Sequence, residues 1–229
     1  MPPPYDVGEA PARESLVAGA HLRRALLAAR RVDAPFRHWL LRDVLPMTLW
    51  PHLLALPFTA PQVGDTLGRR ETHNASRCFV SEEARARLPA CEALAEAFQD
   101  EATVGLIGDM CDIDLTGSFL RIEHCQDTDG FWLEPHTDIG AKRFTMLIYL
   151  SLHPDAENWG TDLLDTRHRL VGRASGAFNT GLVFVPGAES WHGFAPRPIA
   201  GVRRSLIVNY VGPEWRSRHE LAYPGQAVA

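Results

Sequence analysis

The segment L-E-P-H-T-D, Leu133–Asp138, places His136 and Asp138 two residues apart at the entrance to a strand-like run. Side chains two apart on a β-strand share a face, so we expect this imidazole and this carboxylate to point toward one ion. A third ligand is expected further along the chain, and His192, in S-W-H-G-F, opens another extended segment. These three residues are therefore candidate ligands of a single metal ion.

An H-x-D tripeptide by itself arises easily by chance in a chain with 10 histidines. The following segment, R-R-S-L-I-V-N-Y, strengthens the interpretation because strand alternation places Arg203, Ser205, Ile207 and Asn209 on one face. A guanidinium offers a planar fork of donors and a nearby hydroxyl adds another. This face is predicted to bind a carboxylate.

Two histidines and one carboxylate leave one side of a metal open, which suits non-haem Fe(II) oxygenases. The chain also resembles the Fe(II)/2-oxoglutarate-dependent dioxygenases, in particular their prolyl-hydroxylase-like branch. The matching pieces lie in order over about residues 133–211: H-T-D at 136–138, F-T-M-L-I-Y-L-S at 144–151, G-L-V-F-V-P at 181–186, His192, and G-V-R-R-S-L at 201–206. Ser151 stands where the family more often has Asn, a minor departure.

The resemblance implies roles for particular residues. Fe(II) would be held by His136, Asp138 and His192, and the distal carboxylate of 2-oxoglutarate would be bound by Arg203, Tyr149, Thr145 and Ser205. With O₂, such an enzyme converts 2-oxoglutarate to succinate and CO₂ and oxidises an unactivated C–H bond. Halogenating relatives carry a small residue at the position of Asp138, so hydroxylation is favoured over chlorination. Desaturation, ring closure and epimerisation stay open.

The substrate is expected to be a small metabolite, such as an amino acid, a sugar or a natural-product intermediate, because no extra binding module is evident. Trp132 either walls the pocket or covers the rim of the core. Arg121 either reaches a substrate carboxylate or pairs with Glu123. The candidates for contacting an anionic group, each also interpretable as a surface charge, are Lys142, Arg143, Arg197 and Arg204.

Composition narrows the class of protein. The net charge of −5 gives no reason to expect nucleic acid as a partner, and no apolar span of membrane length or signal peptide is evident. The four cysteines contain no C-x-x-C pair, so reduced thiols and a cytoplasmic location are expected rather than a zinc site or disulfides. The oligomeric state is left open.

The predicted fold is mainly β with a helical flank: a double-stranded β-helix, or jelly roll, with N-terminal support helices. Residues 1–13 are expected to be loose and 14–229 to form a single domain, with helical support over about 14–112 and a jelly-roll core over about 113–212. Helices are predicted over 14–31, 50–56, from Ser81 to a break at Pro89, 90–99 and 101–110. Strands are predicted over 118–124, 144–151 and 178–186, with a polar turn at 126–130, a loop at 153–160, a hairpin or rim at 167–177, and a short helix or tail at 214–221.

Two other classes of protein remain compatible with the sequence. A cupin-like metal enzyme would use the same three ligands without 2-oxoglutarate, and it would keep its activity without Arg203. A catalytically silent jelly roll would only bind a ligand or partner and would form no succinate.

Overall fold

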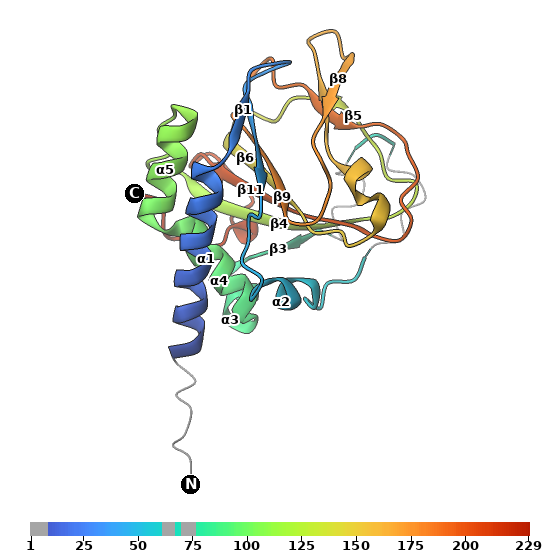
Figure 1. The fold of residues 1–229 in the computed structure, drawn as a ribbon. Coiled ribbons are helices and arrows are strands. Elements are labelled where there is room, and N and C mark those ends of the chain that lie inside the picture. Colours follow the sequence, from blue (N-terminus) through green and yellow to red (C-terminus); the bar gives the residue numbers. More distant parts are fainter. Residues whose placement is uncertain (1–8, 61–66, 70–76) are drawn as a thin grey trace.

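The computed structural model describes residues 9–60, 67–69 and 77–229. Two antiparallel sheets face each other, and helices cover the outer face of the larger sheet (Figure 1). This is the mainly β jelly roll with a helical flank that the sequence predicts. Among the described residues, no helix is both long and apolar enough to cross a membrane.

The larger sheet has the order β1 (Arg30–Val32), β2 (His38–Arg42), β9 (Thr180–Phe184), β6 (Lys142–Tyr149), β11 (Arg203–Val211), β4 (Phe119–Asp127), β3 (Cys78–Phe79). The smaller sheet has the order β5 (Leu133–His136), β10 (His192–Phe194), β7 (Asp162–Leu164), β8 (Leu170–Arg173). The helices are α1 (Glu9–Leu27), α2 (Trp50–Leu54), α3 (Glu82–Arg87), α4 (Pro89–Gln99) and α5 (Glu101–Cys111), with 3₁₀ turns η2 (Pro154–Trp159) and η3 (Arg218–Glu220).

The central strands of the larger sheet separate two environments by alternation. On β11, Leu206, Val208 and Tyr210 face the helices, whereas Ser205 and Ile207 face the smaller sheet. The same period of two recurs on β6 and β4, because successive side chains of a strand point to opposite faces. One face of the sheet therefore builds the main core and the other lines the space between the sheets.

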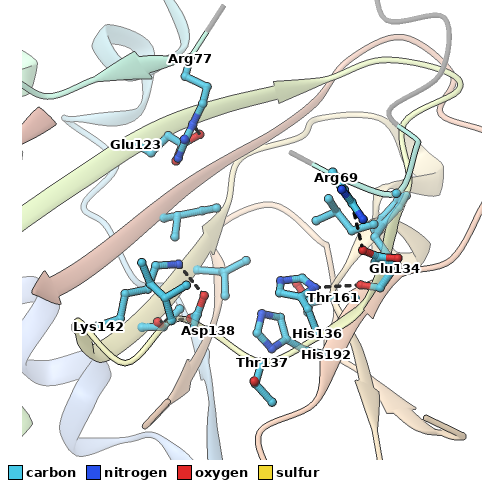
Figure 2. A pocket seen from close by; sticks show the side chains of 18 of the residues that line it. Arg69, Arg77, Glu123, Glu134, His136, Thr137, Asp138, Lys142, Thr161 and His192 are labelled. Atoms are coloured by element: carbon cyan, nitrogen blue, oxygen red, sulfur yellow. Dashed lines mark hydrogen bonds and ion pairs between the residues drawn. The ribbon is translucent and has the colours of Figure 1, made fainter. Parts of the chain in front are cut away.

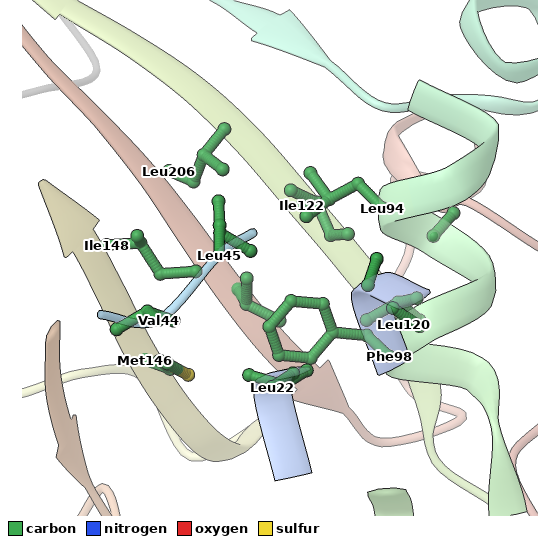
Figure 3. Close-up of a cluster of buried hydrophobic side chains, with 14 of the residues drawn as sticks. Leu22, Val44, Leu45, Leu94, Phe98, Leu120, Ile122, Met146, Ile148 and Leu206 are labelled. Carbon is green, nitrogen blue, oxygen red and sulfur yellow. The ribbon is translucent and has the colours of Figure 1, made fainter. Parts of the chain in front are cut away.

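The main core lies between the larger sheet and the helices. Figure 3 shows Phe98 of α4 in its centre, beside Leu120 and Ile122 of β4 and Leu22 of α1. Phe98 and Leu22 are fully buried. The Tyr210 hydroxyl donates to the Phe98 carbonyl oxygen at 2.5 Å, so α4 is joined to β11 by a hydrogen bond as well as by packing. This layer holds the sheet rigid behind the inter-sheet space.

The helix boundaries follow local signals that the sequence displays. The Ser81 hydroxyl accepts from the Ala84 amide at 3.3 Å and caps α3, as expected, and Pro89 begins α4. The Asp100 carboxylate accepts from the Thr103 amide at 3.0 Å and caps α5. The side-chain oxygens of Ser81 and Asp100 each accept from an amide that has no partner within its helix.

Several predicted boundaries differ from the structure. Helix α1 begins at Glu9, not at Glu14, because Pro11 falls in the first turn, where proline costs no intrahelical hydrogen bond. Of the segment predicted to be loose, residues 1–13, residues 9–13 belong to α1, and residues 1–8 lie outside the described residues. Gln126 and Asp127 belong to β4 rather than to a turn, since they pair with Arg204 and Arg203 of β11. Residues 167–177 form a hairpin, with β8 paired to β7.

We expect Phe98→Ala to lower the free energy of unfolding by about 3–5 kcal/mol, because it leaves a cavity in the main core. Leu27→Ala is the matched control, since Leu27 is 74% exposed at the end of α1. Denaturant unfolding of both variants measures the difference. Equal stability of the two variants would contradict this description of the core.

Candidate metal centre

The two histidines come from neighbouring strands of the smaller sheet. His192, the first residue of β10, is the cross-strand partner of His136, the last residue of β5. Their ring centroids lie 4.4 Å apart. Together with Asp138, each offers one ligand atom, and these atoms all lie within 4.8 Å of one another. The structure thus brings together all three residues that the sequence predicts as metal ligands.

Asp138 reaches this cluster from a different backbone setting than expected. The sequence predicts Asp138 and His136 on one strand. In the structure, β5 ends at His136 and Asp138 lies in the connection to β6. The chain leaves the smaller sheet at this point and enters the larger one at Lys142. The carboxylate is therefore positioned by its side-chain contacts and not by strand alternation.

Hydrogen bonds orient both imidazole rings. Nδ1 of His136 lies 2.8 Å from the Glu134 carbonyl oxygen, and Nδ1 of His192 lies 2.9 Å from the Ser190 carbonyl oxygen. A carbonyl only accepts, so each Nδ1 carries the proton and each Nε2 presents its lone pair. This is the arrangement by which backbone carbonyls orient metal-binding histidines.

The protonation states also suit a cation. Burial, together with the neighbouring His136, lowers the pKa of His192 to about 4, against the opposing effect of Asp138. Burial alone would raise the pKa of Asp138, but Lys142, His192 and hydrogen bonds from Lys142 and Thr145 lower it to about 2. At neutral pH, His192 is therefore a neutral donor and Asp138 an anion.

The cluster opens into a pocket between the two sheets with a volume of about 390 Å³ (Figure 2). On one side of the cluster, the Lys142 ammonium donates to Asp138 Oδ1 at 2.5 Å, and the Thr145 hydroxyl donates to Oδ2 at 2.7 Å. Thr145, which the sequence predicts to bind 2-oxoglutarate, thus lines the pocket. Its hydroxyl, however, contacts the carboxylate of the candidate metal ligand Asp138.

Arg203 lines the same pocket and is 3% exposed. Its Nε donates to the Trp159 carbonyl oxygen at 2.6 Å, its Nη1 pairs with Asp127, and it lies over the Phe194 ring at 4.7 Å. The described residues offer its Nη2 no hydrogen bond. These contacts fix the guanidinium in place, and Asp127 offsets part of its charge.

Ser205 and Tyr149, the other two residues predicted to bind 2-oxoglutarate, are direct neighbours across β11 and β6. The Ser205 hydroxyl is fully buried and has no partner among the described residues. The Tyr149 hydroxyl donates to the Thr161 hydroxyl at 2.8 Å and accepts from the Thr161 amide at 3.1 Å. Burial raises the pKa of Tyr149, although Arg203 acts in the opposite direction. Tyr149 therefore remains a neutral phenol that contacts Thr161.

The tentative substrate residues lie in different places. Trp132 packs against Gly68 and lines a neighbouring small cavity instead of the cluster's pocket. Arg121 lines the pocket, but its guanidinium is paired with Glu123 at 3.0 Å and Glu220 at 2.6 Å. The interpretation that it pairs with Glu123 is therefore confirmed.

The remaining cationic candidates are distributed as follows. Arg143 donates to the Thr116 carbonyl oxygen at 3.4 Å, outside the pocket. Arg197 pairs with Asp162 at 3.0 Å, and Arg204 follows Arg203 on β11 and so faces the opposite side of the sheet. Lys142 is the one of these four that lines the pocket.

Two residues of the pocket, Thr161 and Arg77, and the partner of Arg203, Asp127, were not expected from the sequence. Asp127 falls in a stretch that was interpreted as a turn, and nothing local marks Thr161 as the partner of Tyr149. Arg77 lines the far wall, where it contacts Glu123 with two hydrogen bonds of 2.9 and 2.6 Å. Each of these partners is distant in sequence, so only the strand register brings it to the pocket.

We expect purified protein to bind Mn(II), used as a redox-stable substitute for Fe(II), at one site per chain. His136→Ala and His192→Ala should abolish that binding in isothermal titration, because each removes one of three ligands. His52→Ala is the control, since His52 is exposed on α2, away from the cluster. Unchanged affinity in both cluster variants would rule out this metal centre.

Comparison with known proteins gives matches in structure only. No protein-family model matches the chain, and no curated protein matches its sequence. A prolyl-4-hydroxylase from Pseudomonas putida superposes with a TM-score of 0.51 at 16% identity, covering 85% of this chain and 94% of that one. A prolyl hydroxylase from Trichoplax adhaerens, solved with a peptide fragment of a hypoxia inducible factor, gives 0.52 at 12% identity, covering 90% and 93%. A structure of prolyl 4-hydroxylases from Phytophthora capsici gives 0.54 at 12% identity, covering 94% and 68%. The chain therefore has the fold of the prolyl hydroxylases, as its sequence resemblance implies.

Proposed function

We propose that this protein is an Fe(II)- and 2-oxoglutarate-dependent oxygenase that hydroxylates an unactivated C–H bond. One observation carries the proposal: a cluster of two Nε2 lone pairs and one carboxylate opens into the same pocket as a buried arginine. The two imidazoles and the carboxylate suit Fe(II) as ligands, and the arginine suits the far carboxylate of a dicarboxylic acid. The prolyl-hydroxylase fold supports the same interpretation.

The donor groups fit both the metal and the co-substrate. His136, Asp138 and His192 would hold the iron, and the neutral and anionic states of the ligands match a divalent cation. Arg203 would bind the distal carboxylate of 2-oxoglutarate, because it lines the pocket and its Nη2 has no hydrogen-bond partner among the described residues. The buried hydroxyl of Ser205, without a partner among the described residues, would supply a further hydrogen bond. A buried polar group without a partner is costly, so a carboxylate that accepts from it would be favoured.

When bound, Fe(II) with O₂ and 2-oxoglutarate supplies the oxidative chemistry: the co-substrate becomes succinate and CO₂, and one oxygen atom is inserted into the substrate C–H bond. The residues of this chain bind and orient. Asp127 and the Trp159 carbonyl hold the Arg203 guanidinium against the pocket. Leu147 and Ile207 make the pocket floor between Arg203 and Asn209 apolar, which limits water around the reacting groups.

The substrate we propose is a small metabolite. A pocket of about 390 Å³ lies within the range of roughly 300–1,000 Å³ that holds small molecules. The prolyl-hydroxylase fold favours a second candidate, a proline-containing peptide. A reducing compartment such as the cytoplasm would suit both Fe(II) and the four cysteines, none of which forms a disulfide in the described part of the chain.

Under anaerobic conditions, Fe(II) and 2-oxoglutarate added together should produce a weak visible charge-transfer band. Absorption spectroscopy measures it, with Fe(II) alone as the control. The band should be lost in His136→Ala because the chelate needs an intact ligand set. A band that persists in His136→Ala, or none in the unaltered protein, would count decisively against this function.

Arg203→Leu should weaken 2-oxoglutarate binding about 10- to 100-fold, because a hydrogen bond to a charged group contributes about 1.5–3 kcal/mol. Titration of the charge-transfer band with 2-oxoglutarate measures the change. Arg143→Leu is the matched control, since Arg143 lies outside the pocket. A cupin-like enzyme that does not use 2-oxoglutarate would show the same behaviour in both variants.

The substrate class is tested by succinate formation from 2-oxoglutarate. Panels of amino acids, sugars and small carboxylates should include compounds that stimulate turnover above the uncoupled rate, whereas proline-containing peptides should not. Stimulation by peptides alone would replace the small metabolite with the second candidate.

A further inference from the structure

Asp138 needs side-chain restraint because it lies in a connection between two sheets. We propose that Asn209, oriented by Arg121, is a positioning residue that holds the Asp138 carboxylate through the Thr145 hydroxyl. This inference rests on the proposed metal site and concerns residues that need not contact iron, co-substrate or substrate.

The three residues form one row across the larger sheet. Arg121 of β4 is the cross-strand partner of Asn209 of β11, and Asn209 is the partner of Thr145 of β6. Arg121 Nη1 donates to Asn209 Oδ1 at 3.2 Å, Asn209 Nδ2 donates to Thr145 Oγ1 at 2.9 Å, and Thr145 donates to Asp138 Oδ2 at 2.7 Å. All three side chains are at most 2% exposed, so water does not compete for these hydrogen bonds.

The direction of every hydrogen bond in the row is fixed from its cationic end. A guanidinium has donors only, so the Asn209 group that faces Arg121 must be its oxygen. The Asn209 amide nitrogen then faces Thr145 and donates to its oxygen. Since that oxygen now accepts, the Thr145 proton is directed to Asp138. The network thus assigns the amide orientation and leaves one arrangement for the hydroxyl.

The row is anchored at the far end by the C-terminal part of the chain. Arg121 Nε donates to Glu220 in η3 at 2.6 Å, and Arg121 also forms an isolated β-bridge with Leu221. Its Nη2 donates to Glu123 at 3.0 Å. With these carboxylates around it, Arg121 cannot rotate without leaving buried charges unpaired, which is costly. The end segment of the chain therefore supports the candidate metal centre.

The two oxygens of the Asp138 carboxylate therefore have different hydrogen-bond donors. Oδ2 is held by Thr145, and Oδ1 is contacted by the Lys142 ammonium, whose side chain is 18% exposed. Of the two contacts, that of Lys142 is the more easily exchanged, because it ends a flexible stem beside the pocket. Oδ1 is therefore the oxygen that remains for a metal. Hydrogen bonds of this kind orient ligands, and their loss typically weakens metal binding by about 10- to 100-fold.

A double-mutant cycle with Mn(II) alone tests the proposal. Isothermal titration would compare the unaltered protein with Thr145→Val, Asn209→Leu and the double variant. If Asn209→Leu does not fold, Asn209→Ala replaces it, because the smaller side chain leaves room for a water beside Arg121. We expect Thr145→Val to weaken Mn(II) binding about 10- to 100-fold and the double variant to be no weaker than Thr145→Val, because both changes break one chain of hydrogen bonds. Thr145→Ser, which keeps the hydroxyl, should restore the affinity.

The control variant is Ser151→Ala. Ser151 is 2% exposed and accepts from the Arg204 amide at 2.8 Å, so its loss should lower the thermal midpoint without changing Mn(II) affinity. Affinities of Thr145→Val and of the Asn209 variant equal to that of the unaltered protein would overturn the positioning role, as would losses that simply multiply in the double variant. These outcomes are separable from failure of the metal site, in which the unaltered protein would not bind Mn(II) or would bind it as well after His136→Ala.

Discussion

The antiparallel pairing of β10 with β5 is the constraint on which the site depends. It puts His192 directly opposite His136, and the backbone carbonyls of Ser190 and Glu134 then fix both rings with Nε2 outward. Gly193 favours the close approach of the two strands, because a Cβ there would lie 3.0 Å from the Leu133 carbonyl oxygen and would push β5 slightly away. The smaller sheet thus supplies two oriented ligands before any other element contributes.

The larger sheet supplies the remaining groups through alternation. Each of its central strands gives apolar residues to the helical side, whereas its inter-sheet side carries polar residues together with apolar ones such as Leu147 and Ile207, so a single register sets both the core and the pocket. Along β11 the inter-sheet face runs from Arg203 through Ser205 and Ile207 to Asn209, and Arg203 and Ile207 of these line the pocket. The proposed carboxylate-binding residue, Arg203, and the proposed positioning residue, Asn209, therefore lie on the same strand with apolar Ile207 between them.

Charge pairing limits what this pocket can accommodate. Arg203 is paired with Asp127, and Arg121 with Glu123 and Glu220, so most buried charges are already compensated within the protein. Compensated guanidinium groups are held in place and avoid the cost of burying an isolated charge. Lys142, paired with Asp138, is more exposed than these two arginines, at 18%.

The sequence by itself determined which side chains could form the site. The alternation of R-R-S-L-I-V-N-Y predicted the face that Arg203 and Asn209 share, because that pattern depends only on the local period of a strand. The H-x-D motif and His192 identified the three candidate ligands by residue type, although Asp138 lies outside the strand that carries His136. Helix starts at Ser81 and Pro89 were equally local. Only the tertiary structure decided the partners: Asp127 for Arg203, Thr161 for Tyr149, and Asn209 with Thr145 for Asp138. The register between strands far apart in the chain brings Asp127 to Arg203 and Asn209 to Thr145, and no local pattern encodes that register. Thr161 reaches Tyr149 because the residue before β7 packs against β6.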